Sequence, residues 1–204
     1  MSNKIYVDPR KVILTDCDGV LLDWEYSFKV WMMHRGYEAQ VSGTYNIAEM
    51  FDITKSEKDT LVRQFNESAA IGFLPPLRDA VHYVRKLHDE HGYVFHCLTS
   101  LSDDPSAKRL RQMNLDKVFG KGIFEVLTCA DTGADKHEIL EPYRNSRCVW
   151  VEDKAENAQL GLEMGLSSVL FGHDHNINSN IGCPRVWKWK HIYDMIALSE
   201  IVED

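Results

Sequence analysis

Short runs of consecutive apolar residues recur along the chain, and each run stops abruptly at polar residues. The runs cover residues 11–15, 93–98, 123–127, 148–151 and 168–171. Runs of this length without a polar alternation are typical of strands that are buried on both faces, as in a parallel sheet. The sequence therefore predicts five buried strands.

Helical patterns separate these predicted strands. Apolar residues spaced three or four positions apart occur in 77–87, 110–113, 139–143 and 155–164, and a last helix is expected near 192–201. Asp104-Pro105 adds a helix cap followed by a proline at the first helical position. Strands that alternate with helices predict an α/β fold, a doubly wound parallel sheet with helices on both faces.

The segment 24–74 breaks this alternation, because it contains helical patterns and no convincing strand. Its helical faces are marked by Phe28, Trp31 and Met32 and then by Leu61, Val62 and Phe65. A segment of this length is too long for an ordinary connection between a strand and a helix. We therefore expect a core domain made of residues 1–23 and 75–204, with a small helical cap formed by 24–74.

The composition is that of an ordinary globular chain. Its 204 residues are 44% hydrophobic, and 31 acidic against 23 basic residues give a net charge of −8, which disfavours binding along an extended nucleic acid. No apolar run approaches the roughly 20 residues of a membrane span, and the first six residues lack the pattern of a secretory signal. Five scattered cysteines argue against a zinc ribbon or a disulfide framework. We expect a cytoplasmic protein that binds no membrane.

Polar side chains stand where the predicted strands end and just before one of the predicted helices. They are Asp16, Asp18, Thr99, Ser100, Lys136, Glu152 and Asp153. In a parallel sheet these residues converge on one edge, where ligands bind. Carboxylates so close together repel one another unless a cation joins them. Hard oxygen ligands on a shallow edge suit Mg²⁺, which shares its coordination with water and substrate phosphate.

The sequence Asp16-Cys17-Asp18-Gly19-Val20 is the sharpest of these elements. Asp16 leaves the strand as a candidate nucleophile, and Asp18 follows where a tight turn can bring it to the leaving-group side of a substrate. Gly19 allows the backbone to turn and to approach a phosphate. The structural alternative is an Asx-turn that caps the strand and exposes two solvated acids.

Asp16-x-Asp18-Gly19-Val20 after an apolar strand resembles the first motif of the haloacid dehalogenase (HAD) superfamily. Leu98-Thr99, Lys136 and Val151-Glu152-Asp153 resemble its second, third and fourth motifs, in the same order. The resemblance implies a HAD-like fold and a phosphatase that forms an aspartyl-phosphate, with Asp16 as nucleophile and Asp18 as general acid and base.

The same resemblance implies a role for each remaining motif residue. Mg²⁺ would be held by Asp16, by the backbone carbonyl of Asp18 and by Asp153. The phosphate oxygens would be bound by Thr99, Ser100, Lys136 and the backbone at Gly19. Glu152 stands where the family usually has an aspartate, and we expect it to orient a metal-bound water rather than to bind the metal.

A closer resemblance points to the 5′(3′)-deoxyribonucleotidases, which carry a helical cap between the first two motifs. The similar segments are 16–25 with Phe28, Leu74-Pro-Pro-Leu77 and Pro184-Arg185-Val186. This resemblance implies a nucleoside monophosphate as substrate, with Trp24 and Phe28 either stacking on the base or filling the seam between cap and core. Two alternatives stay open: another small phosphomonoester, such as a sugar phosphate or a nucleic-acid terminal phosphate, or a silent HAD scaffold that binds a ligand or a partner.

Two further motifs are interpreted as structural. His173-Asp174-His175 resembles a metal-binding pattern, but we expect these histidines on a solvated loop. Trp187-Lys188-Trp189-Lys190 alternates aromatic and basic residues, and we expect it to pack along an edge of the sheet rather than to bind nucleic acid.

Overall fold

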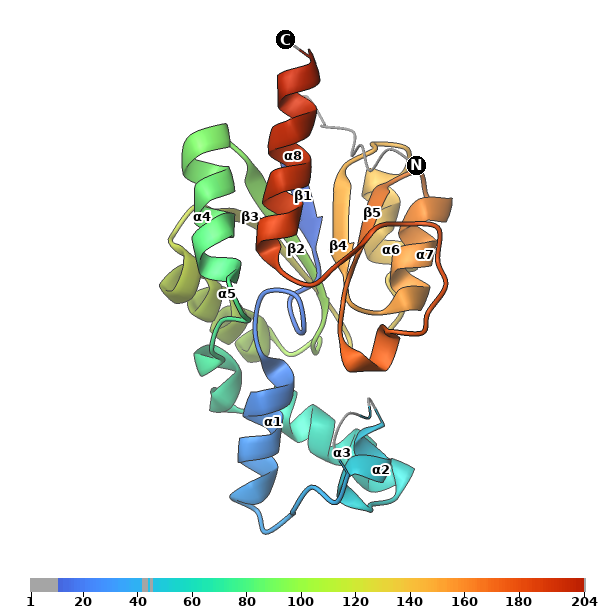
Figure 1. The fold of residues 1–204 in the computed structure, drawn as a ribbon. Coiled ribbons are helices and arrows are strands. Elements are labelled where there is room, and N and C mark those ends of the chain that lie inside the picture. Colours follow the sequence, from blue (N-terminus) through green and yellow to red (C-terminus); the bar gives the residue numbers. More distant parts are fainter. Residues whose placement is uncertain (1–10, 42–43, 45, 204) are drawn as a thin grey trace.

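The computed structural model describes residues 11–41, 44 and 46–203, with side chains through residue 198. The first ten residues, on which the expectation of no secretory signal depends, lie outside this range. Six parallel strands form one sheet in the order β3-β2-β1-β4-β5-β6 (Figure 1). The strands are β1 Val12–Thr15, β2 Val94–Ser100, β3 Phe124–Ala130, β4 Val149–Glu152, β5 Ser167–Phe171 and β6 Arg185–Val186.

All five predicted strands are confirmed, and the structure adds β6 at the edge of the sheet. A two-residue strand is too short to leave a hydrophobic pattern, which is why the sequence did not predict it. Of the two tryptophans that follow β6, Trp189 is fully buried, and its ring packs against those of Phe95 on β2 and Phe171 on β5. Its Nε1 donates a hydrogen bond to the carbonyl of Val20 (2.8 Å). Trp187 is 42% exposed, and the expectation that both pack along an edge is wrong for Trp189, which lies against a face of the sheet.

Helices cover both faces of the sheet, so the doubly wound arrangement is confirmed (Figure 1). One face is covered by α4 Ala80–His91, α5 Pro105–Phe119 and α8 Trp189–Glu203, and the other by α6 His137–Leu140 and α7 Ala155–Glu163. A short 3₁₀ helix, η2 Glu141–Tyr143, extends α6. Neighbouring strand residues point to opposite faces: Ile13 and Val151 pack with the first group, and Leu14 and Trp150 with the second.

Helix α5 begins as predicted but turns a different face inward. The Asp104 side chain accepts hydrogen bonds from the backbone N–H groups of Ser106 (2.7 Å) and Ala107 (2.9 Å), with Pro105 in the first turn. Its buried residues, however, include the polar pair Arg111 and Asn114, whereas Met113 of the predicted apolar face is 43% exposed. The polar inner face of α5 becomes important at the site.

Four helical elements lie between β1 and α4, beyond the carboxyl ends of the strands (Figure 1). They are α1 Trp24–Met33, α2 Ile47–Phe51, α3 Lys55–Asn66 and the 3₁₀ helix η1 Ala69–Phe73, and we call residues 24–74 the cap segment. Its interior is aromatic: the Phe28 ring contacts the rings of Trp24, Trp31, Phe51 and Phe65 at centroid distances of 4.7–6.0 Å.

The two connections to the cap segment run side by side. Leu22 and Pro76 form an antiparallel bridge, the N–H of Asp23 donates to the carbonyl of Pro75 (2.9 Å), and the N–H of Leu77 donates to the carbonyl of Leu21 (2.8 Å). The cap segment thus leaves and rejoins the core at one place, next to the end of β1.

Side-chain contacts hold the cap segment over the ends of β2 and β3. The Asn66 side chain donates a hydrogen bond to the carbonyl of Leu101 (2.8 Å), just after β2. Arg63 forms two hydrogen bonds with Asp131, just after β3, both at 3.0 Å. These contacts place the helices directly above the edge where the predicted site residues lie.

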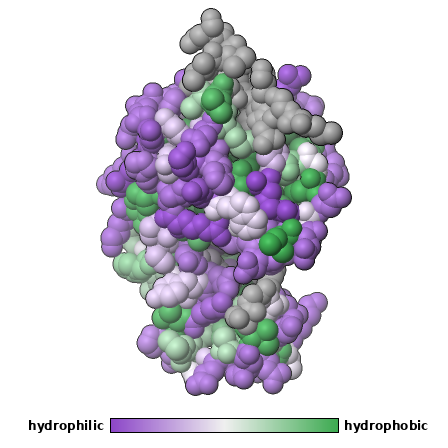
Figure 2. Space-filling view, in the orientation of Figure 1, coloured by the Kyte–Doolittle hydropathy of each residue, from purple (hydrophilic) through white to green (hydrophobic). Residues whose placement is uncertain are grey.

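The remaining surface has no extended apolar region on the face that Figure 2 shows, where hydrophobic residues are scattered among hydrophilic ones. Among the described helices, none combines the length and the apolar character that crossing a bilayer requires. All five cysteines are described, and each is a free thiol, as their scattered spacing predicts.

Candidate active site

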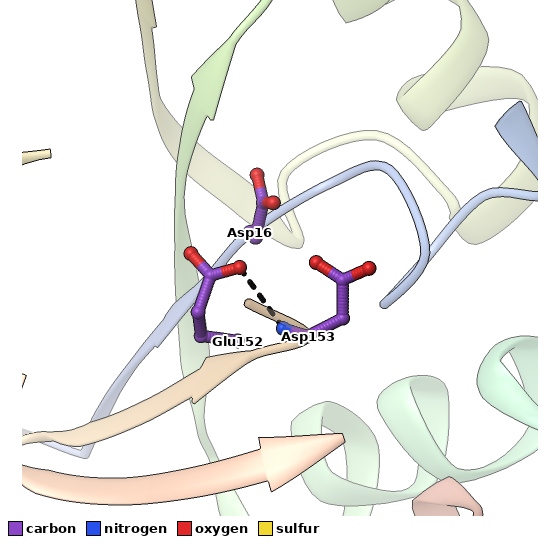
Figure 3. Close-up of side chains that lie close together, drawn as sticks. All are labelled: Asp16, Glu152 and Asp153. Atoms are coloured by element: carbon purple, nitrogen blue, oxygen red, sulfur yellow. Dashed lines mark hydrogen bonds between the residues drawn. The ribbon is translucent and has the colours of Figure 1, made fainter. Parts of the chain in front are cut away.

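The strand order reverses at β1, which has β2 on one side and β4 on the other. In doubly wound sheets the crevice at such a reversal is where ligands bind. Asp16 follows β1, Glu152 ends β4, and Asp153 comes next. All three side chains are buried, and one carboxylate oxygen from each lies within 4.8 Å of the others (Figure 3). The predicted convergence of these acids is therefore confirmed.

Asp16 is held by hydrogen bonds on one oxygen of its side chain. Its Oδ1 accepts from the backbone N–H of Cys17 (2.7 Å) and from Nζ of Lys136 (2.8 Å). The backbone N–H of Asp16 donates to the carbonyl of Val151 on β4 (2.9 Å), which joins the two strand ends that carry the acids. The two hydrogen bonds to Oδ1 restrict the rotation of the Asp16 carboxylate.

Lys136 reaches this cluster from the start of α6, and its side chain is only 2% exposed. Its Nζ donates to the carbonyl of Leu98 at the end of β2 (2.5 Å) and lies 3.8 Å from an oxygen of Glu152. Burial alone favours the neutral amine, but the carboxylates of Asp16 and Glu152 outweigh it and raise the pKa of Lys136. Lys136 therefore stays an ammonium in the middle of the acidic cluster.

Glu152 and Asp153 differ in how their carboxylates are used. Oε1 of Glu152 accepts hydrogen bonds from the backbone N–H groups of Asp153 and Lys154, both at 2.9 Å, and Oε2 accepts from the side chain of Asn157 (3.1 Å). Glu152 thereby stabilises the start of α7, and its expected role in orienting a metal-bound water stays a prediction. Burial raises the pKa of Asp153 well above its usual value, and repulsion from Glu152 and Asp16 raises it further.

Gly19 brings the first motif against Asp153. It adopts a positive φ of +77°, and a Cβ at this position would clash with the Asp153 carboxylate. A glycine is therefore required here both for the backbone conformation and for the close approach. The turn places the backbone around Gly19 next to Asp153, and its expected approach to a phosphate stays a prediction.

Asp18 points in a different direction from the other acids. Its carboxylate is not part of the cluster; instead, both of its oxygens accept hydrogen bonds from Arg111 of α5, at 2.6 and 3.0 Å. Burial raises the pKa of Asp18, and the Arg111 charge opposes this shift. The expectation that Asp18 contributes its backbone carbonyl to a metal stays a prediction.

Thr99 and Ser100 stand at the end of β2, beside the Leu98 carbonyl that Lys136 contacts. Thr99 is 1% exposed, and the Ser100 hydroxyl donates to the carbonyl of Ala134 (2.8 Å). Ser100 thus links the end of β2 to the loop that leads to Lys136. Their roles as phosphate ligands stay predictions.

Trp24 and Phe28 stack on each other within the cap segment, with ring centroids 4.7 Å apart and planes at 9°. Nε1 of Trp24 donates to the Asn66 side chain (2.9 Å), and Phe28 is only 1% exposed. In this structure the two rings pack with other aromatic rings of the cap segment. The two roles that the sequence left open, stacking on a base and filling the seam between cap and core, stay predictions.

The histidines of His173-Asp174-His175 are partly buried rather than fully solvated, which corrects that expectation in part. Both are half-buried, with ring centroids 5.3 Å apart. Nε2 of His173 donates to the carbonyl of Gly19 (2.6 Å), and Nε2 of His175 donates to the carbonyl of Asp153 (3.2 Å), which also accepts from the Asn176 side chain (2.7 Å). These residues brace the two loops that carry the acids, across sequence separations that no local pattern reveals.

The donor set of this cluster fits a divalent cation that prefers oxygen. The described residues bring together three buried carboxylates, and only one ammonium, that of Lys136, lies among them. An oxygen-only donor set suits a hard divalent cation better than a metal that prefers nitrogen or sulfur ligands. Burial is the main cause of the raised pKa of Asp153, and the negative charges of Glu152 and Asp16, which a cation would neutralise, raise it further.

Comparison with known proteins places the fold. No family model matches the chain. A protein of Enterobacteria phage T4, described as an uncharacterized 32.4 kDa protein in the Gp30-rIII intergenic region, is 25% identical over 90% of this chain and 68% of its own length.

Solved structures give the more extensive likeness. A haloacid dehalogenase-like hydrolase of Streptococcus pneumoniae has a TM-score of 0.63 at 14% identity, covering 90% of this chain and 97% of the other. CbbY of Rhodobacter sphaeroides in complex with phosphate has a TM-score of 0.57 at 17% identity, covering 89% and 96%. The chain therefore has the fold of the HAD-superfamily hydrolases, as the motifs predict.

Proposed function

We propose that the chain is a Mg²⁺-dependent phosphate-monoester hydrolase that acts through an aspartyl-phosphate, with nucleoside monophosphates as its substrates. The observation that carries this proposal is the buried cluster of Asp16, Glu152 and Asp153 around the Lys136 ammonium, at the point where the strand order reverses. Carboxylates and an amine gathered at that place suit the transfer of a phosphoryl group.

Asp16 is the nucleophile in this proposal. Its carboxylate is oriented by the N–H of Cys17 and by Lys136, so the attacking group needs little reorganisation. Lys136, with Thr99, Ser100 and the backbone at Gly19, binds the phosphoryl oxygens, whose negative charge the buried ammonium stabilises.

Asp18 serves as acid and base in two successive steps. In the first step an oxygen of Asp16 bonds to phosphorus, the ester bond breaks, and Asp18 gives its proton to the leaving oxygen. In the second step water attacks the aspartyl-phosphate, Asp18 takes one of its protons, and Asp16 is released. General acid–base catalysis of this kind contributes about 10²–10⁴ in rate.

Mg²⁺ would be held by the carboxylates of Asp16 and Asp153 and by the backbone carbonyl of Asp18, with Glu152 in support. The cation supplies the positive charge that lets an anionic nucleophile approach an anionic ester. Lys136 alone cannot balance the three buried carboxylates and a phosphate.

The cap segment, which we take as a separate small domain of residues 24–74, favours a small substrate. It lies over the carboxyl edge of the sheet and is tied there by Asn66 and Arg63, so in the proposal a small ester is favoured over an extended polynucleotide. In the proposal the base stacks on half-buried Trp24 of the cap segment, whose ring lies on that of Phe28 in this structure. A sugar phosphate is the second candidate, since a structural neighbour of similar fold, a CbbY mutant, was solved with xylulose-(1,5)bisphosphate.

A panel of phosphomonoesters assayed with Mg²⁺ tests the proposal. We expect nucleoside monophosphates to be hydrolysed faster than sugar phosphates, and Asp16→Asn to abolish turnover of every ester. Asp89→Asn, at an exposed position on α4, is the matched control and should keep full activity. A preference for sugar phosphates would change the substrate class. Binding of Mg²⁺ without hydrolysis of any ester would instead identify a silent scaffold.

A further inference from the structure

Arg111 is the one arginine of the described chain whose side chain is completely buried beside the candidate site. It comes from the inner face of α5, and its exposed fraction is 0%. Its two terminal nitrogens donate to both oxygens of Asp18, at 2.6 and 3.0 Å, and one of them also lies 3.1 Å from the sulfur of Cys17. Such a two-point contact fixes the plane of a carboxylate as well as its position.

Burying this guanidinium is unfavourable by itself. Arg111 Nε has no hydrogen-bond partner within the described residues, and a buried charge must be desolvated. The core of an α/β fold gains more from an apolar side chain at such a position. A buried arginine with an unsatisfied nitrogen therefore indicates that its contact with Asp18 has a use other than stability.

The contact between Arg111 and Asp18 reaches the Asp18 carboxylate from its buried side. The Asp18 side chain is 21% exposed, whereas Arg111 behind it is 0% exposed. Arg111 therefore holds Asp18 from the interior of the protein and leaves part of its side chain exposed. Because the carboxylate of Asp18 is absent from the cluster of Asp16, Glu152 and Asp153, Arg111 also keeps this fourth acid away from the cation position.

The same helix face is joined to the cap segment. One turn after Arg111, the Asn114 side chain bonds to both the N–H (3.0 Å) and the carbonyl (3.1 Å) of Leu74, where the chain returns from the cap. A Cβ at Gly72 would meet the side chains of Leu110 and Met113, so η1 packs tightly on α5. Helix α5 thus fixes the cap connection and the Asp18 carboxylate together.

Given the proposed function, on which this inference rests, we infer that Arg111 is a positioning residue that orients the Asp18 carboxylate toward the leaving oxygen of the substrate and keeps that carboxylate from binding the metal. When Asp18 is ionised, Arg111 donates to both of its oxygens. When Asp18 carries the proton, its carbonyl oxygen still accepts from Arg111, and its O–H points to the accessible side. The proton that Asp18 takes from water in the second step is the one it gives to the leaving oxygen in the next cycle.

The test uses aryl phosphates whose leaving groups differ in acidity. Dinitrophenolate leaves without a proton, whereas phenolate needs one, so only the phenyl ester depends on a well-placed acid. We expect Arg111→Lys to lower kcat/KM for phenyl phosphate by about 10²-fold while leaving dinitrophenyl phosphate nearly unchanged. Asp18→Asn should show the same selectivity, and adding Arg111→Lys to it should change the ratio of the two esters no further. Arg109→Lys, on the exposed face of α5, is the control and should match the wild type.

If Arg111 acts only in folding, Arg111→Lys should lower the activity on both esters equally, and that result would overturn the inference. A further change in the ratio of the two esters when Arg111→Lys is added to Asp18→Asn would overturn it as well. Arg111→Met provides a second variant without charge, and circular dichroism shows whether each variant is folded. If the wild type hydrolyses neither ester, the proposed function is wrong and the role of Arg111 falls with it. If the wild type hydrolyses both and Arg111→Lys leaves their ratio unchanged, only the role of Arg111 is wrong.

Discussion

Replacing Asp153 by asparagine should stabilise the metal-free protein while removing its response to Mg²⁺. The carboxylate oxygens of Asp153, Asp16 and Glu152 lie within 4.8 Å of one another. At an effective dielectric constant of about 20, two unit charges at that distance repel by about 3.5 kcal/mol. Asp153 faces two such carboxylates, and the Lys136 ammonium offsets roughly one of them.

About one repulsive pair therefore remains in the metal-free protein, and proton uptake by the cluster relieves part of it. We expect Asp153→Asn to raise the free energy of unfolding of the metal-free protein by about 1–2 kcal/mol, which corresponds to an increase of about 2–8 °C in Tm for a chain of this size. In the wild type, Mg²⁺ at about 100 times its Kd should add about 2.7 kcal/mol, or roughly 5–10 °C. The variant should show almost none of this increase.

The pH dependence of the stability provides an independent test of the same repulsion. Burial and the neighbouring acids raise the pKa of Asp153 in the folded state, so the folded protein holds this proton more tightly than the unfolded chain does. This tighter proton binding stabilises the folded protein most below the ordinary carboxyl pKa of 3.8. The stabilisation is lost as the pH rises through the pKa that Asp153 has in the folded protein. The Tm advantage of Asp153→Asn over the wild type should therefore grow from acid to neutral pH.

Thermal unfolding followed by circular dichroism, with EDTA or with Mg²⁺, measures these effects. Asp89→Asn removes an exposed carboxylate from α4 and should leave both the Tm and the Mg²⁺ response unchanged. A variant that is less stable than the wild type in EDTA would refute the argument from repulsion. An undiminished increase with Mg²⁺ would show that the cation binds elsewhere.

Three further predictions concern residues around the site. Gly19→Ala should fold but lose the Mg²⁺-induced increase in Tm, because its positive φ and the clash with Asp153 displace the loop. Asn114→Leu should lower the stability measured by urea unfolding by about 2–4 kcal/mol, since it leaves the buried N–H and carbonyl of Leu74 unpaired. Arg63→Ala should keep a Tm close to that of the wild type, because exposed ion pairs add little, while hydrogen exchange of the α3 amides becomes faster as the contact with the loop after β3 is lost.

The sequence predicted the sheet and the acids of the site for the same physical reason. Strands buried on both faces must be apolar throughout, so their ends are visible as the first polar residues, and parallel strands bring those ends to one edge. Asp16, Glu152 and Asp153 are therefore placed by the pattern alone. Strand β6 was missed because two residues are too few to show a hydrophobic pattern. The predicted helix over 139–143 proved to be one turn of α6 followed by η2.

Arg111 and the two histidines could not be predicted in this way, because their partners lie far away in the sequence: 93 residues separate Arg111 from Asp18, and 154 separate His173 from Gly19. On α5 the apolar positions Leu110 and Met113 predict one inward face, but the residues that turn inward include Arg111 and Asn114. A polar side chain on the buried face of a helix follows no hydrophobic period, so only the fold reveals it.

That failure is itself informative about the site. A sequence that specifies one fold is expected to agree with its local patterns nearly everywhere, and it departs from them mainly where a residue serves another purpose. In this chain α5 departs from its pattern at Arg111, which contacts Asp18, and at Asn114, which holds the connection from the cap segment. Both departures lie on the helix face between the cap segment and the first motif. Helix α5 is therefore where we expect substitutions to alter acid–base catalysis while the carboxylates of the metal cluster remain intact.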